Sequence, residues 1–213
     1  MGCTIIDVLR HPQPMTIMNV VWPVTMLFGT IFTYLLYIKF GRQPRPDGRR
    51  STATPFPAMV AKAALHCGSG CTLGDILAEG VTAAFPAVLL WVGWRSLFSE
   101  RLFAAWLLDF ILAFGIGLIF QYCTIVPMRD LSPSEGWVAA LKADFLSLTA
   151  WQIGMYGFMA FAHFVLFGHL LGVALKPTHV EFWFMMQIAM IGGFFTAYPV
   201  NWWLLRSGIK ERM

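Results

Sequence analysis

The sequence predicts an all-α, polytopic transmembrane helical bundle of about five spans. The 213 residues are 58% hydrophobic and only 12% charged, whereas a soluble domain carries about 25% charged residues. Several apolar runs reach the roughly 20 residues that a helix needs to cross a bilayer. The runs are continuously apolar rather than alternating with a period of two, which excludes a transmembrane barrel.

The chain divides into four expected segments, each marked by a change in composition. They are a polar lead-in over residues 1–15, a first transmembrane helix over 16–40, a basic Pro-rich cytoplasmic linker over 41–64, and a four-helix membrane domain over 65–213 that opens with a His-Cys-Gly-Ser-Gly-Cys motif. Gly41 and Arg42 are a plausible stop for the first helix. Four prolines break any helix in the linker: Pro44, Pro46, Pro55 and Pro57.

The four later spans follow from the remaining apolar runs. They are expected at about residues 72–94, 102–126, 135–171 and 181–205. The run over 135–171 is longer than one bilayer crossing, so this helix is expected to protrude from the membrane or to bend near Gly154 and Gly157. Gly208 marks the end of the last span.

The distribution of Lys and Arg predicts the orientation in the membrane. With five spans, four basic residues fall on the side of the N-terminus and eleven on the opposite side. The positive-inside rule then puts the N-terminus outside and the C-terminus in the cytoplasm. The net charge of +4 is accounted for by this loop bias, so we expect no nucleic-acid partner.

Thiol, imidazole and carboxylate groups gather at the expected mouth of the second span. If a helix begins near Cys71, then Cys71, Asp75 and Glu79 share one face, and His66 and Cys67 lie on the preceding glycine-containing loop. Sulfur, nitrogen and carboxylate ligands suit Cu⁺, Zn²⁺ or Hg²⁺. The predicted metal ligands are therefore His66, Cys67, Cys71, Asp75 and Glu79, although inert packing of the thiols is an open alternative.

Carboxylates within the apolar spans indicate a candidate pathway. A charged group inside a membrane usually faces a cavity, a partner or an ion path. Asp144 shares a helical face with Met155 and Met159, whose thioethers can bind Cu⁺. The candidate pathway residues are Asp109, Asp144, Met155, Met159 and His163. Helix packing and interfacial solvation are the alternatives for these side chains.

Three motifs resemble a bacterial membrane family that is catalogued as domain of unknown function 4396. They are His66 to Ile76, then Lys142 to Asp144 with Leu146 to Thr149, and Ala197 to Trp203. The resemblance extends from the first span to the C-terminus. It implies an integral membrane protein and an association with heavy-metal handling, and it supplies no catalytic residues.

Three functions are compatible with these features. The first is binding or transport of a soft transition-metal ion in a bacterial cytoplasmic membrane. This function does not require enzymatic activity, and it is compatible with a homo-oligomer. The second is a thiol–disulfide oxidoreductase that uses Cys67 and Cys71, although cytoplasmic thiols stay reduced. The third is a structural subunit of a larger membrane complex.

Overall fold

The computed structural model describes residues 2–13, 15–42, 54–129 and 131–211, and these form a helical bundle without a β-strand element. The elements are α1 (Gly2–Arg10), α2 (Met18–Leu36), the π-helix η1 (Tyr37–Gly41), α3 (Phe56–Ala84), α4 (Val88–Trp91), α5 (Arg101–Arg129), α6 (Pro133–Ala160), the π-helix η2 (Phe161–Leu170) and α7 (Val180–Arg206). The prediction of an all-α bundle is confirmed.

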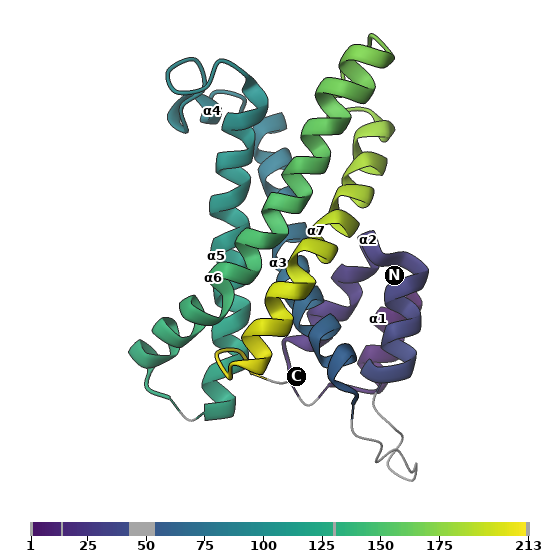
Figure 1. Ribbon diagram of the computed structural model, residues 1–213, viewed down its shortest axis with the longest axis vertical. Helices are drawn as coiled ribbons and strands as arrows, with labels where there is room; N and C mark the ends of the chain where they lie inside the picture. Colours follow the sequence, from purple (N-terminus) through teal and green to yellow (C-terminus); the bar gives the residue numbers. More distant parts are fainter. Residues whose placement is uncertain (1, 14, 43–53, 130, 212–213) are drawn as a thin grey trace.

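Four stretches in the described residues are long and apolar enough to cross a membrane. They are Met18–Gly41, Arg101–Arg129, Pro133–Leu170 and Val180–Arg206. The helix that is expected to protrude or bend runs from Pro133 to Leu170 and changes from α to π geometry at Phe161. Helices α3, α5, α6 and α7 alternate in direction along the bundle (Figure 1).

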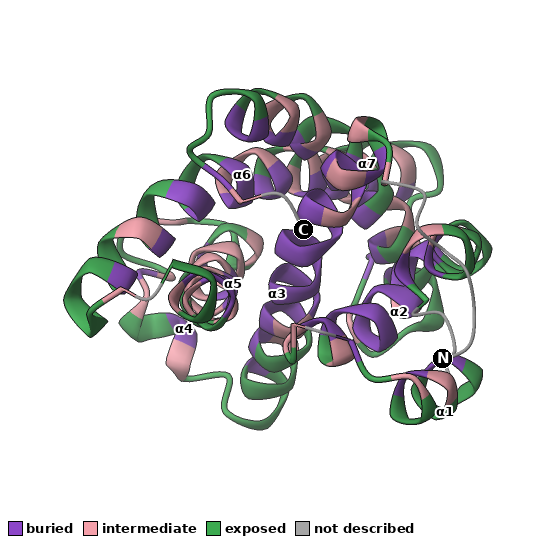
Figure 2. Cartoon of the chain, turned by 90° about the horizontal axis from the view of Figure 1, so that it is seen from below, coloured by how far each residue is buried: buried purple, intermediate pink, exposed green. Residues whose placement is uncertain are grey.

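Helix α3 is the central element, and most of its residues are buried (Figure 2). Small residues let α5 pack closely against it. A Cβ atom added to Gly70 would lie 2.9 Å from the Cα of Gly117, and one added to Gly74 would lie 2.5 Å from the Cα of Ala113. Glycine is needed at both positions because the two backbones are almost in contact. The same helix therefore carries the sequence motif and forms the axis of the fold.

The motif lies inside α3, not at a helix mouth. We expected a helix start near Cys71 with His66 and Cys67 on a loop, and this expectation is wrong because the helix begins at Phe56. Pro57 falls in its first turn, where the missing N–H costs nothing. The helix ends at Ala84, well before the expected Trp94, because Phe85 precedes Pro86 and has a non-helical backbone. Residues 43–53 of the expected linker lie outside the described residues.

The first apolar stretch folds back on itself at Thr30, where the backbone is non-helical (φ 39°, ψ −115°). The ring centroids of Trp22 and Tyr37 are 5.3 Å apart, whereas a straight helix would separate these residues by about 22 Å. Each limb of this hairpin is only about 18 Å long, too short for the roughly 30 Å hydrocarbon core. The stretch is therefore a helical hairpin rather than one continuous helix.

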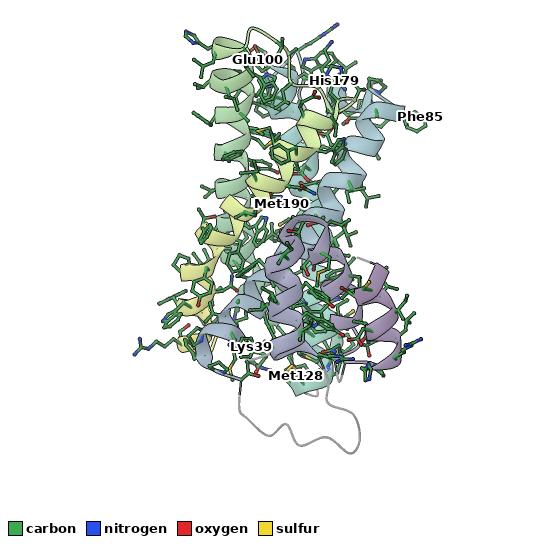
Figure 3. The ribbon with its side chains drawn as sticks, turned by 90° about the vertical axis from the view of Figure 1, so that its right-hand side faces the viewer. Lys39, Phe85, Glu100, Met128, His179 and Met190 are labelled. Carbon is green, nitrogen blue, oxygen red and sulfur yellow. The ribbon has the colours of Figure 1, made fainter. Side chains whose placement is uncertain are left out.

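The hairpin enters only one half of the bundle. At its tip, the side-chain amide of Gln187 donates to the carbonyl of Leu27 (2.9 Å), and Phe28 packs edge-on against Trp151 with ring centroids 5.5 Å apart. Figure 3 shows Lys39 and Met128 at one end of the molecule and Phe85, Glu100 and His179 at the other.

Both chain ends lie in the same half of the bundle. Helix α1 is tied to the outgoing end of the hairpin, because Arg42 donates two hydrogen bonds to the Asp7 carboxylate (2.8 and 2.9 Å). The C-terminal segment reaches the end of α5 through the Arg129–Glu211 ion pair. Since the hairpin returns the chain to the side it started from, the expectation of five crossings with termini on opposite sides is not met (Figure 1).

Candidate functional site

Adjacent polar residues of the motif point to different neighbours. The Nε2 atom of His66 lies 3.2 Å from the hydroxyl of Thr124 on α5, whereas Cys67 faces α6. Consecutive residues of a helix are rotated by about 100°, so an unbroken helix cannot converge His66 and Cys67 on one ion. No group of three or more His, Cys, Asp or Glu side chains that could hold a metal occurs among the described residues. The predicted five-residue ligand set is therefore not assembled.

Cys67 instead forms a buried polar cluster with residues from α6, α7 and the C-terminal segment. Its Sγ lies 2.8 Å from Oδ1 of Asp144 and 2.9 Å from Oγ of Ser147. The side-chain amide of Asn201 donates to Ser147 Oγ (2.7 Å). The fifth member is Lys210, and these five residues are called the Cys67 cluster below. All five are 2% exposed or less.

Lys210 supplies the positive charge of this cluster. Its Nζ atom lies 3.0 Å from Cys67 Sγ, 3.0 Å from Asn201 Oδ1, 3.5 Å from Ser147 Oγ and 3.6 Å from Asp144 Oδ1. Burial lowers the pKa of Lys210, but Cys67 and Asp144 raise it more, so that it stays above its ordinary value. The ammonium is thus charged and surrounded by one sulfur and three oxygen acceptors, as a bound cation would be.

Asp144 keeps one oxygen free within this cluster. Its Oδ2 atom is buried and has no hydrogen-bond partner. Space for it exists because α5 carries Gly117 at this level, where an added Cβ would lie 2.8 Å from that oxygen. The prediction singled out Asp144 as a pathway residue, and the structure brings it to Cys67 of the motif.

A second polar cluster lies two helical turns further along α3 and has a different character. The carboxyl groups of Asp75 and Asp109 are neighbours, and Gln152 lies beside Asp109. The hydroxyl of Tyr156 donates to Asp109 Oδ2 (2.6 Å). These four residues are called the Asp75 cluster below. Among the described residues, no Lys, Arg or His forms a salt bridge with either carboxylate.

The remaining predicted site residues lie outside both clusters. Cys71 is fully buried one turn from Cys67, and both are free thiols. Glu79 is half-buried one turn beyond Asp75. Met155 and Met159 belong to the apolar core, as the packing alternative expects. His163 lies on η2 with its ring against Phe164 (4.8 Å), toward the far end of the bundle.

Sequence reasoning missed four members of the two clusters. Lys210 was counted only as a cytoplasmic charge, and nothing in its local sequence indicates that it turns into the bundle. Gln152 and Tyr156 are spaced four apart in an apolar helix, and that spacing was the available signal for a shared polar face. Asn201 was noted only as part of a motif. Each of these side chains joins its cluster through contacts with residues that are distant in the sequence.

The comparisons with known proteins agree with the extent of this core. A family model described as Domain of unknown function (DUF4396) matches residues 58–210, a range that includes every residue of both clusters. No curated protein and no solved structure matches the chain.

Proposed function

The chain belongs to the DUF4396 family, and we propose that it is an integral membrane protein that binds a soft or borderline transition-metal ion at the Cys67 cluster and moves it along α3. Zn²⁺ and Cu⁺ are the ions that its donor atoms suit best. The ligands in this proposal are the Cys67 thiolate and the Asp144 carboxylate, supported by the oxygens of Ser147 and Asn201. This set replaces the ligands expected from the sequence.

One observation carries the proposal: four acceptor atoms from three helices converge on a single cation, the Lys210 ammonium. Ionisable residues inside a membrane bundle are costly and usually mark an ion or proton path. A cluster that served packing alone would be replaced by apolar side chains with little loss of stability.

The charges of the cluster are suited to exchange of Lys210 for a metal ion. With Lys210 protonated, Cys67 as a thiol and Asp144 ionised, the cluster is neutral. When Zn²⁺ enters, Cys67 loses one proton and the Lys210 side chain withdraws, so the site that remains, one Zn²⁺ with a thiolate and a carboxylate, is again neutral. Neutrality in both states matters because an uncompensated charge in this buried position is strongly unfavourable.

The proposed setting is a bacterial cytoplasmic membrane, with both chain ends in the cytoplasm. Among the described Lys and Arg residues, eight lie toward the end of the bundle with the chain termini and three toward the other end, namely Arg95, Arg101 and Lys176. The positive-inside rule then makes the end with the termini cytoplasmic. The Cys67 cluster lies in that half, so the ion would be exchanged with the cytoplasm.

The test is the metal content of protein purified without a metal-affinity tag and exposed to Zn²⁺ or Cu⁺. Wild type should bind about one ion per chain, and Cys67→Ser should lose most of the affinity because a soft sulfur becomes a hard, protonated oxygen. Cys71→Ser is the matched control, since it makes the same change in a buried cysteine one turn away and should keep the ion.

Two results would contradict the proposal. A folded wild type that stays metal-free under both ions would remove it, and equal loss of metal in the two cysteine variants would move the site away from Cys67. Reversible Cys67–Cys71 disulfide formation in a metal-free protein would favour the thiol–disulfide alternative instead.

A further inference from the structure

The Asp75 cluster has buried polar atoms that the described chain satisfies only in part. Both carboxyl oxygens of Asp75, the Oδ1 atom of Asp109 and both amide atoms of Gln152 form no hydrogen bond of good geometry among the described residues, although the Asp75 carboxyl and the Gln152 amide lie within reach of the Asp109 carboxyl. The three side chains are 2%, 6% and 1% exposed. Buried polar groups in native proteins are nearly always paired, so a group of incompletely paired atoms from three helices points to a ligand.

We propose that this cluster is a second cation site, lined only by oxygen and selective for a hard metal cation such as Na⁺, Mg²⁺ or Ca²⁺. Carboxylate and amide oxygens are the ligands that hard cations prefer, and no thiol is needed to complete the set. Two neighbouring carboxylates without a cationic side chain would repel each other, and a bound cation removes that repulsion.

The number of free oxygens favours a metal ion over a single shared proton. A proton held between Asp75 and Asp109 would engage only one oxygen of each, leaving the second oxygen of Asp75 buried without a partner. A metal ion accepts several oxygens at once. The close packing of α3 on α5 through Gly70 and Gly74 holds the two carboxylates at a fixed separation, as a coordination site requires.

A cavity lies beside the Asp75 end of the cluster. Asp75 lines a partly open cavity of about 170 Å³ between α3, the tip of the α2 hairpin and α7, together with Thr72, Gln187 and Met190. A cavity of this size admits several water molecules. Met190 marks its level near the middle of the bundle in Figure 3. The carboxyl oxygens of Asp75 are buried beside this cavity, so a local side-chain movement is needed before an ion reaches them.

A hard cation at the Asp75 cluster would be a second ion, in addition to the transition metal of the proposed function. Asp75 follows Cys67 by two helical turns, or about 12 Å along α3. A hard cation bound there would be the ion whose movement is coupled to that of the soft metal, and this coupling role, unlike the site itself, rests on the proposed function.

The test measures the thermal midpoint of the purified full chain in detergent during titration with NaCl, MgCl₂ or CaCl₂, at constant ionic strength set by choline chloride. At least one of the three should raise the Tm of wild type in a saturable way, because a ligand that binds only the folded state stabilises it. Asp75→Asn and Asp109→Asn should each abolish the shift. Glu79→Gln, which neutralises a carboxylate one turn from Asp75, should keep it.

Cys67→Ser separates this inference from the proposed function. The hard-cation shift should persist in that variant even if transition-metal binding is lost or never present. No saturable shift of wild type with any of the three salts would overturn the second site, and so would an equal shift in wild type and Asp75→Asn. The wild-type titration decides the question even if a variant fails to fold.

Discussion

The two polar clusters on α3 both bury carboxylates, but they differ in whether a cationic side chain balances the charge. The Cys67 cluster contains its own cation, and each of its five side chains has at least one partner. The Asp75 cluster has two carboxylates, no cationic side chain among the described residues and five atoms without a hydrogen bond of good geometry. Burial is nearly complete in both, so burial does not explain the difference.

The consequence of burying a charged side chain therefore depends on whether a counter-charge lies beside it. A cluster with an internal cation is stable when empty and must release that cation to bind another. A cluster without one is strained when empty and is stabilised by whatever cation enters. The first arrangement suits controlled exchange, and the second suits a permanent dependence on an ion in solution. Four substitutions test this contrast, in decreasing order of expected effect.

The largest effect is expected from breaking the internal ion pair. Asp144→Asn removes the carboxylate and leaves Lys210 buried beside a thiol and three neutral side chains. Loss of one partner of a buried pair costs about 3–5 kcal/mol, so the free energy of unfolding in metal-free detergent solution should fall by that order. An unchanged stability would mean that the Lys210–Asp144 contact does not form in solution.

A smaller effect is expected from separating α3 and α5, on which the Asp75 cluster depends. Gly74→Ala introduces a Cβ only 2.5 Å from the Cα of Ala113, and such overpacking costs about 1–3 kcal/mol. Gly80→Ala is the matched control on the same helix, because an added Cβ there meets no atom within 4 Å. It should be neutral or stabilising, since Ala favours helix over Gly. Equal effects would argue against close packing at Gly74.

When no hard cation is present, Asp75→Asn should change the free energy of unfolding in the opposite direction to Asp144→Asn. Removing one of two neighbouring carboxylates relieves repulsion, so the variant should equal or exceed the stability of wild type by up to about 1 kcal/mol. Chemical denaturation in choline buffer measures this. A destabilisation as large as that of Asp144→Asn would remove the distinction between the two clusters.

The smallest effect is expected at the exposed Asp7–Arg42 pair, which is a surface reference for the buried one. Burial raises the pKa of Asp7, but hydrogen bonds from Arg42 and Tyr37 bring it below its ordinary value of 3.8. Because the folded-state pKa is lowered, the stabilisation is fully present above pH 3.8 and is lost as the pH falls through the folded-state value.

Asp7→Asn should therefore lower the Tm slightly at pH 7, and the difference from wild type should vanish in strong acid. Added salt should weaken it as well, because exposed charges are screened. A difference that grows as the pH falls would contradict this account of the pair.

The sequence was sufficient for the fold class because apolar composition alone separates membrane helices from soluble ones. It was also sufficient to single out Cys67, Asp75, Asp109 and Asp144, since ionisable groups in apolar helices are rare. It failed at the α2 hairpin, whose reversal at Thr30 is marked by no proline and by no polar run. The length and hydropathy of Met18–Gly41 are those of an ordinary span.

The arrangement of the site could not be predicted because it depends on tertiary contacts. Gly68 and Gly70 resemble loop glycines in sequence, but in α3 they serve packing: an added Cβ on Gly68 would meet the ring of Trp151, and one on Gly70 the backbone of Gly117. Only tertiary contacts distinguish these two uses of glycine. Lys210 joins Cys67 across 143 positions of the chain, and no local pattern encodes such a contact.

The most direct test of the central claim, that Lys210 occupies a cation site, is metal rescue of a variant that lacks it. Lys210→Met leaves Asp144 without its counter-cation, so the metal-free variant should melt below wild type. Zn²⁺ or Cu⁺ should then raise its Tm by more degrees than that of wild type, because no internal competitor has to leave. In Lys210→Met/Asp144→Asn, both charges are gone, so the metal-free protein should recover stability and the metal should no longer raise its Tm. A metal-induced shift that is the same in the single and double variants, or absent from both, would contradict the account.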